Sequence, residues 1–437
     1  MKKIITLAVA LATLAVPAAT AQKINDAAFK AKLEKSNLDI ENPKKSGKSA
    51  TWYNRGKICV DAIVAPTKNI FSGLDANMLA MSLGVPATEV KGDIHSFDWV
   101  DIHTKNGKVV AWGIKKEVLP NAYEIAKEAF LKAYELDPAS AAKIKTALDV
   151  LINHYSELGS VSLDVSEYKT AIDAYMKAVG LQQNPAIGKE DSRYYFFAGQ
   201  LAAFLGAQDA KYFADGEKYL NKALELGYKD EQGNLYYFLF HCYYGQKSVD
   251  RDANLAKAKE ALLTGIKKFP KNSLILDGLM NLYTAEEGVG DPAELVAMID
   301  SSLKDDATNY DLWFGRGRVF YALKNFDEGV KSFEKCVELR PNDFEANFYT
   351  GYLIIEKANA AVEALNANSN LSYEEYEAEY AKINDIYAEA IPWLEKAHEI
   401  NPSDRATIEF LNNLCFRLRD MDGMMDKYNK YHELFMN

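Results

Sequence analysis

The sequence lacks the features of a membrane protein or a nucleic-acid-binding protein. After residue 21, no apolar stretch approaches the length of about 18 residues that indicates a transmembrane helix, so we expect no transmembrane anchor. Acidic residues outnumber basic ones: the sequence has 62 Asp and Glu and 51 Lys and Arg, for a formal net charge of −11. Since an acidic surface repels the phosphate backbone, we expect no nucleic-acid partner.

Motifs of common enzymes are also missing. His432 and Glu433 are not followed by the second histidine, four residues after His432, that a zinc-protease helix requires. The Gly-Val-Gly-Asp-Pro segment at 288–292 lacks the lysine of a phosphate-binding loop, and no cysteine shares a local signature with a histidine. We therefore predict that the protein is not an enzyme and has no catalytic residues and no cofactor.

The first 21 residues have the pattern of a signal peptide. Lys2 and Lys3 precede an apolar run over residues 4–16, which is shorter than the roughly 20 residues that span a bilayer. Ala19, Thr20 and Ala21 then provide the small residues of a cleavage site. We expect cleavage after Ala21 and export of the mature chain to the periplasm or out of the cell.

An apolar helical segment that ends in proline recurs along the chain. It is found at residues 133–138, 265–270, 336–341 and 397–402. Proline ends a helix because it has no amide hydrogen to donate and because it restricts the residue before it. Recurrence on this scale indicates stacked pairs of helices.

Residues 310–343 carry the pattern of one complete repeat unit. Small and aromatic residues occupy matching places on its two expected helices, followed by a closing proline: Trp313, Gly317, Phe320, Gly329, Phe333, Cys336 and Pro341. In this pattern the unit resembles the tetratricopeptide repeat (TPR) family. The resemblance implies an all-α fold, a right-handed TPR-type helix-pair solenoid, and a non-catalytic scaffold that binds a protein or peptide.

Other helix pairs match the pattern less completely. The expected pairs are 140–159 with 166–180, 192–205 with 212–226, 233–245 with 254–268, and 272–284 with 291–303. The predicted signal peptide at 1–21 is followed by residues 22–65, which hold an unpaired leading helix (24–36) and the first helix of the first unit. An insertion at 66–119 comes next, and the solenoid then covers 120–343. The chain ends with a unit that has an extended helical arm at 344–402 and with capping helices (404–418 and 421–435) within 403–437.

The insertion at 66–119 does not follow the helical pattern. Asn106-Gly107 is a preferred two-residue hairpin turn, and aromatic and β-branched residues lie on both sides of it. We predict a small β-hairpin with antiparallel strands near 94–103 and 108–115.

Four polar residues would share one face of the first predicted strand: Asp93, His95, Asp101 and His103. They allow two interpretations, a metal site or a solvated polar face. On one straight strand Asp93 and His103 would lie more than about 30 Å apart. We therefore predict no metal site.

The unit that begins at residue 344 has unusually long helices. Its first helix is expected to run to about residue 367, and Ser372 with Glu375 forms a capping box that begins a long return helix. One apolar stripe follows at spacings of three and four residues: Tyr376, Tyr380, Ile383 and Tyr387. These helices predict an extended helical arm, with Pro392 near its base.

Cysteine is scarce and widely spaced. Only Cys59, Cys242, Cys336 and Cys415 occur, each within an apolar helical pattern of a different unit. A disulfide requires Cα atoms within about 7 Å, which units that are not neighbours in a stack do not provide. We expect four buried free thiols.

The TPR resemblance also implies where a partner binds. By analogy with the concave face of the family, contacts are expected from Asp311, Phe314, Arg318, Tyr321, Phe348 and Tyr352. Some family members hold a terminal carboxylate with a lysine and an asparagine four residues apart, and that clamp is absent here. The identity of the protein or peptide partner and the oligomeric state are left open.

A second hypothesis is a glycan-binding component of an envelope nutrient-capture system. Trp99 and Trp112 of the insertion would then stack on sugar rings. The 26 tyrosines, several of them in adjacent pairs, fit either a binding surface or packing between helices.

Overall fold

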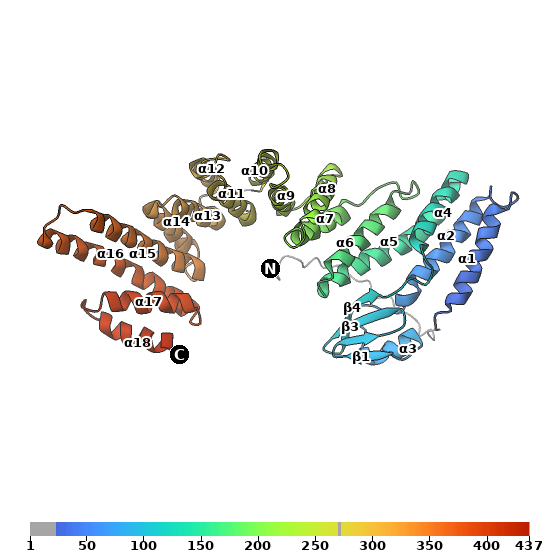
Figure 1. Ribbon diagram of the computed structural model, residues 1–437, viewed down its shortest axis with the longest axis horizontal. Helices are drawn as coiled ribbons and strands as arrows, with labels where there is room; N and C mark the ends of the chain where they lie inside the picture. The colour runs from blue at the N-terminus through green and yellow to red at the C-terminus, as the bar shows by residue number, and fades with distance from the viewer. Residues whose placement is uncertain (1–22, 270–271, 437) are drawn as a thin grey trace. The chain divides into compact units, whose positions relative to one another are not determined.

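The computed structural model describes residues 23–269 and 272–436 (Figure 1). The predicted signal peptide at 1–21 lies outside the described residues. The chain divides into two compact units, which we call unit 1 (Met1–Lys229) and unit 2 (Asp230–Asn437). Within them the fold is a TPR-like array of helix pairs with a small antiparallel sheet inserted, which confirms the predicted helical fold class.

Unit 1 consists of a leading helix, helix pairs and the inserted sheet. Its longer helices are α1 (Asp26–Glu41), α2 (Ser49–Val64), α4 (Ala122–Leu136), α5 (Ala141–Asp164), α6 (Tyr168–Gln182), α7 (Ser192–Gly206) and α8 (Lys211–Glu225). Helix α2 packs on α4, α5 on α6, and α7 on α8.

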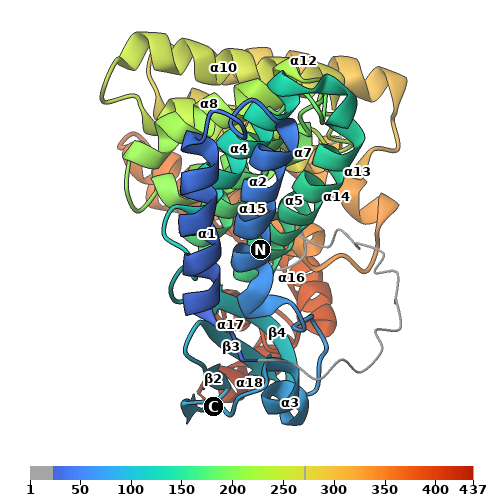
Figure 2. The ribbon, with the colours of Figure 1, turned by 90° about the vertical axis from the view of Figure 1, so that its right-hand side faces the viewer.

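The leading helix α1 is not unpaired as predicted. It lies alongside α2 (Figure 2). The guanidinium of Arg55 on α2 donates a hydrogen bond to the Asn37 side chain of α1 at 2.6 Å. The apolar side chains of Phe29 and Leu33 on α1 add packing against the core of unit 1.

The insertion folds into a sheet with more strands than the predicted hairpin. Its elements are the short helix α3 (Leu79–Leu83) and the strands β1 (Glu89–Lys91), β2 (Ile94–Ser96), β3 (Val100–Lys105) and β4 (Lys108–Ile114), which pair antiparallel in that order. Asn106 and Gly107, both at positive φ, form the predicted turn between β3 and β4. The predicted strand 94–103 is broken, because residues 97–99 turn the chain back and the Phe97 amide donates to the Val100 carbonyl at 2.9 Å.

This turn separates the four polar residues that were predicted to share a strand face. Ile94 pairs with His103, and His95 pairs with Ile102. Since paired residues share a face and neighbours alternate, His95 and His103 point to opposite faces. Asp93, whose carbonyl accepts from the Thr104 amide at 2.7 Å, lies beside β3 instead of far along a straight strand.

The sheet lies beside one end of α2 and α5, and β4 contacts α5 (Figure 1). Trp112 on β4 is only 2% exposed, and Lys116 lies over the ring of Trp99 with its Nζ 4.2 Å from the centroid. The two tryptophans therefore do not present a pair of open faces to a sugar, contrary to the glycan hypothesis.

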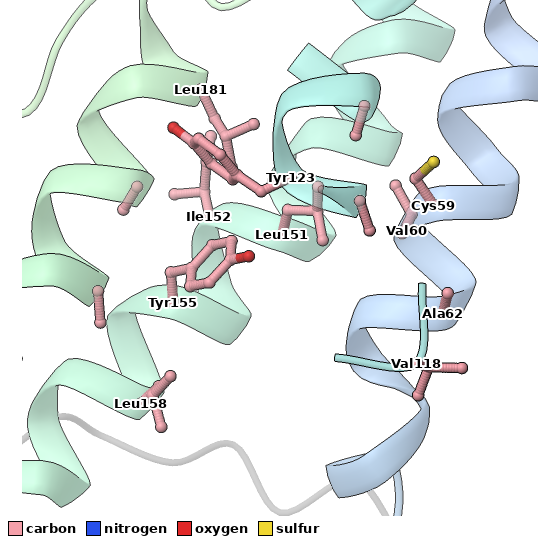
Figure 3. Packing of buried hydrophobic residues seen from close by; sticks show 14 of the residues in the cluster. Cys59, Val60, Ala62, Val118, Tyr123, Leu151, Ile152, Tyr155, Leu158 and Leu181 are labelled. Carbon is pink, nitrogen blue, oxygen red and sulfur yellow. The ribbon is translucent and has the colours of Figure 1, made fainter. Parts of the chain in front are cut away.

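One continuous core joins the sheet to the helices of unit 1. Figure 3 shows Tyr123 of α4 and Tyr155 of α5 within it, near Ile152 and Leu158. The two tyrosine rings meet edge to face with centroids 5.6 Å apart, a favoured aromatic geometry. The core thus fixes the sheet to the helix pairs.

The described residues of unit 2 form helices and the turns that join them, with no strand. Its helices are α9 (Asn234–Gly245), α10 (Arg251–Lys268), α11 (Ser273–Ala285), α12 (Pro292–Asp305), α13 (Tyr310–Ala322), α14 (Phe326–Leu339), α15 (Phe344–Ala367), α16 (Tyr373–Ile400), α17 (Arg405–Arg417) and α18 (Met424–Met436). Successive helices pack as pairs. Most begin after an Asn, Asp or Ser whose side chain accepts a hydrogen bond from a first-turn amide, which satisfies a donor left free by helix geometry.

The extended arm is formed by α15 and α16, which pack along each other. The predicted capping box is present, with the Ser372 hydroxyl accepting from the Glu375 amide and the Glu375 carboxylate accepting from the Ser372 amide. Ile383 and Tyr387 of the predicted stripe are buried against α15. Helix α16 continues through Pro392.

All four cysteines are buried and free, as predicted. In the described parts of the chain, no helix combines the length and the apolar character that crossing a bilayer requires.

Candidate binding groove in unit 2

A groove of about 430 Å³ opens in unit 2 where α11, α13 and α15 meet. Residues from these helices and from the end of α14 line it: Ser273, Leu276, Asp277, Tyr310, Asp311, Phe314, Gly315, Arg318, Arg340, Asp343, Glu345 and Tyr349. The Asn309 side chain caps α13 by accepting from the Leu312 amide at 3.3 Å. A helix begun there places Tyr310, Phe314 and Arg318, four residues apart, on one face.

The close approach of α11 and α13 depends on Gly315. A Cβ atom at this position would overlap the side chain of Leu276 on α11. The absence of a side chain therefore brings Asp277 of α11 within reach of Arg318 of α13, where the two form an ion pair.

Aromatic rings form one wall of the groove. Phe314 stacks on Tyr310 with centroids 5.8 Å apart, and its edge meets Tyr349 of α15 at 5.7 Å. Arg340 lies over the Tyr310 ring in a cation–π contact, with its guanidinium carbon 3.8 Å from the ring centroid. This wall offers flat apolar area that a partner side chain can cover.

The charges of the groove are mostly negative, and both arginines are already engaged. Arg318 pairs with Asp277, and burial raises the pKa of the Asp277 carboxyl while Arg318 opposes that rise. Asp343 caps α15 by accepting from the Ala346 amide at 2.9 Å. Asp311 and Glu345 form no ion pair with any described residue of the chain.

Tyr310 sits between these groups. Burial, followed by the nearby Asp343 carboxylate, raises the pKa of its phenol. The hydroxyl therefore stays protonated and keeps a proton to donate within the groove.

The six residues predicted from the TPR analogy fall into two neighbouring sets. Asp311, Phe314 and Arg318 line the groove. Tyr321, Phe348 and Tyr352 form an aromatic cluster beside it, in which the Tyr321 and Tyr352 hydroxyls lie 3.1 Å apart. The Phe348 and Tyr352 rings are nearly parallel, with 4° between their planes and centroids 6.2 Å apart.

Sequence reasoning missed several members of both sets. Phe410 of α17 contacts Phe348 and Tyr352 with centroid distances of 6.0 and 5.6 Å, although it is far along the chain. Asp277 comes from α11, outside the matched repeat unit. Tyr310 could have been found, since it precedes Phe314 by one helical turn.

These helix pairs define a helical-repeat protein with a groove between its helices. Residues 310–343 match the family model of the tetratricopeptide repeat. The chain therefore contains a TPR repeat within a TPR-like array, and TPR repeats imply protein partners. No curated protein matches the chain by sequence.

Solved structures with some similarity include MamA and two bacterial TPR proteins. MamA MSR-1 is 19% identical with a TM-score of 0.28, over 48% of this chain and 97% of that one. A TPR repeats protein from Bacteroides fragilis is 17% identical with a TM-score of 0.28, over 60% and 97%. A thermophilic TPR protein from Thermus thermophilus is 14% identical with a TM-score of 0.32, over 47% and 99%. Similarity at these values defines neither a partner nor a role for this chain.

Proposed function

We propose that this protein is an exported TPR scaffold that binds a protein or peptide in the groove of unit 2. The observation that carries the proposal is the groove itself, which combines an aromatic wall with two acidic side chains, Asp311 and Glu345, that lack an ion-pair partner in the described residues. The groove is built on rigid helices, so a partner orders few groups of the scaffold when it binds.

The groove chemistry specifies the kind of segment it takes. A Lys or Arg side chain of the partner would pair with Asp311 and Glu345. An apolar or aromatic side chain next to it would cover Phe314 and Tyr349, since large rigid rings contribute most of the binding energy in such contacts. The preferred partner segment is therefore basic and apolar in alternation.

A peptide array tests this preference. Peptides that alternate Lys or Arg with Leu or Phe should bind the full-length mature protein, whereas peptides with Glu in place of the basic residues should not. The double variant Asp311→Asn/Glu345→Gln should weaken binding about 10-fold or more, in line with loss of charged contacts at an interface. Glu363→Gln, an exposed site on the same helix as Glu345, is the matched control. Equal binding by both variants would refute the groove as the site.

Export to the periplasm, or secretion, is the second part of the proposal and rests on the pattern of residues 1–21. Mass spectrometry of the protein recovered from the periplasmic fraction should give a mature N-terminus at Gln22. Recovery of the intact chain from the cytoplasm alone would contradict it.

A further inference from the structure

Unit 1 contains a second hollow, of about 310 Å³, between the inserted sheet and the helix pairs. Its walls come from the end of α2, the segment that joins β4 to α4, and the facing sides of α5 and α6. Unlike the groove of unit 2, it is not part of the surface that the TPR resemblance implies. It exists because the sheet is inserted within the first repeat unit.

Part of the lining of this pocket is apolar. Ala62 and Ile63 of α2, Leu119, and Leu158 of α5 contribute hydrocarbon surface. Figure 3 shows Ala62 and Val118 on one side of this region and Tyr155 and Leu158 on the other. Burying such surface against an apolar group contributes about 25 cal/mol per Å².

The lining also carries cations in different states of pairing. Lys115 is 3.3 Å from a carboxylate oxygen of Asp101, and Lys116 covers the ring of Trp99. Lys177 of α6 has no carboxylate within ion-pair distance among the described residues. Its Nζ lies over the tyrosine pair, 5.7 Å from the Tyr123 centroid and 5.5 Å from the Tyr155 centroid.

Neutral hydrogen-bonding groups also line the pocket. His154 of α5 and Thr170 of α6 both line it with Lys177. No described group of the chain hydrogen-bonds to the ring nitrogens of His154. Burial, followed by the charge of Lys177, lowers the pKa of His154 to about 4, so its ring is neutral at pH 7 and donates from one nitrogen. The site therefore offers one unpaired positive charge and two neutral hydrogen-bonding groups.

Two carboxylates limit the charge of a ligand. Glu117 and Asp173 also line the pocket. Because Lys115 is already paired with Asp101, the charges of Lys116 and Lys177 balance those of Glu117 and Asp173. A ligand with a single negative charge beside Lys177 is favoured, whereas Glu117 and Asp173 would repel a dianion.

We infer that this pocket binds a small organic monocarboxylate. The carboxylate lies beside Lys177 and His154, and its apolar tail lies against Ile63, Leu119 and Leu158. This site and its ligand class are independent of the protein-binding groove in unit 2.

Calorimetric titration of the full-length mature protein with hexanoate at pH 7 tests the inference. Saturable binding is expected for hexanoate, with at least 10-fold weaker binding for hexanamide, hexylamine and inorganic phosphate. Lys177→Gln should weaken hexanoate binding about 10-fold, and Thr170→Val should weaken it less. Lys169→Gln, an exposed site on the same helix and outside the pocket, should bind like wild type.

His154 provides a second readout in the same protein. Bound hexanoate places an anion beside the ring, so the pKa of His154 followed by NMR of ring-labelled histidine should rise, and at the same hexanoate concentration it should rise less in Lys177→Gln. The inference is overturned if hexanoate does not bind saturably, if hexanamide binds as well as hexanoate, if Lys177→Gln binds like wild type, or if the His154 signal does not respond.

Discussion

The ring of Phe333 on α14 occupies the space that a side chain on Gly317 of α13 would need, because a Cβ atom there would lie 2.8 Å from the ring. Phe333 is fully buried and stacks in turn on Tyr349 of α15, with centroids 5.4 Å apart. One small residue therefore sets the spacing of a helix pair and, through the aromatic ring, its contact with the next helix.

Gly317→Ala is expected to destabilise unit 2 by about 1–3 kcal/mol, the usual cost of overpacking a core. Urea unfolding combined with hydrogen exchange of amides in α13 and α14 measures this loss. Lys331→Ala, which removes an exposed ion pair on α14, should change stability by less than about 0.5 kcal/mol. Adding Phe333→Leu to Gly317→Ala should recover part of the overpacking loss. A Gly317→Ala protein as stable as wild type would show that the helices separate without cost.

Glu286 makes the stability of unit 2 sensitive to acid. Its side chain is only 8% exposed and contacts Lys247 at 2.5 Å and Arg251 at 2.9 Å, and hydrogen bonds led by Lys247 lower its pKa to about 2. Because the folded-state pKa lies below the unfolded value, this contribution is full above pH 4.5 and is lost as the pH falls toward 2.

Urea unfolding between about pH 2.5 and 6 checks this dependence. Glu286→Gln should unfold more easily at the upper end of this range and lose less stability on acidification than wild type. Glu294→Gln, exposed on α12, should keep the wild-type slope. Parallel pH profiles of wild type and Glu286→Gln would contradict the assignment.

His154 gives unit 1 a different pH dependence. Its folded-state pKa of about 4 lies below the ordinary histidine value of 6.5, so the unfolded chain takes up the proton first. Stability should therefore fall as the pH drops from 6.5 to 4. The charged groups that line the pocket with the ring are Lys115, Lys116, Glu117, Asp173 and Lys177, and Lys177 acts directly on the pKa of His154. In His154→Gln this slope should flatten, whereas His103→Gln, on the opposite side of its strand from buried Ile102, should leave it unchanged. Denaturant titrations that follow the fluorescence of Trp52 and Trp112 report on this unit.

The cap of the arm can be tested alone. Ser372→Ala removes the hydroxyl that accepts from the Glu375 amide, which should cost about 1 kcal/mol. Faster hydrogen exchange is expected in the first turn of α16 and no change at its far end, near Ala397. Ser403→Ala, at an exposed hydroxyl outside the helices, serves as control. Uniformly faster exchange along α16 would mean that the helix opens as one piece.

The cysteines should be inert in the native protein. Burial raises the pKa of the Cys59 and Cys415 thiols to about 11 and that of Cys336 to about 12, so the reactive thiolate is scarce near neutral pH. Iodoacetamide followed by mass spectrometry should label them slowly in buffer and quickly in urea. Rapid labelling of Cys59 without denaturant would show that unit 1 opens near its first helix pair.

The helices could be read from the sequence because their signals are local. The predicted helix at 192–205 agrees to within one residue with α7 (Ser192–Gly206). β1 could not be predicted, since its three residues are all exposed and are too few to establish a strand pattern. The break between β2 and β3 was missed because residues 97–99 hold neither glycine nor proline.

The residues of the groove also divide into those that a local sequence pattern predicts and those that it does not. Phe314 and Arg318 follow from the repeat pattern of their own helix. Their partners Tyr349 and Asp277 come from α15 and α11, and no spacing within one helix indicates which residues of other helices will face them. Contacts of this kind depend on how the units stack.

The insertion of the sheet between α2 and α4 also bears on how the chain assembles as it is made. During synthesis, α14 follows α13 after a short turn. The partner of α2, which is α4, is synthesised only after residues 65–121. Bridging a flexible segment of that length adds roughly 2–3 kcal/mol of closure entropy relative to a three-residue turn. Early formation of the sheet would shorten the span that must close and so reduce this cost.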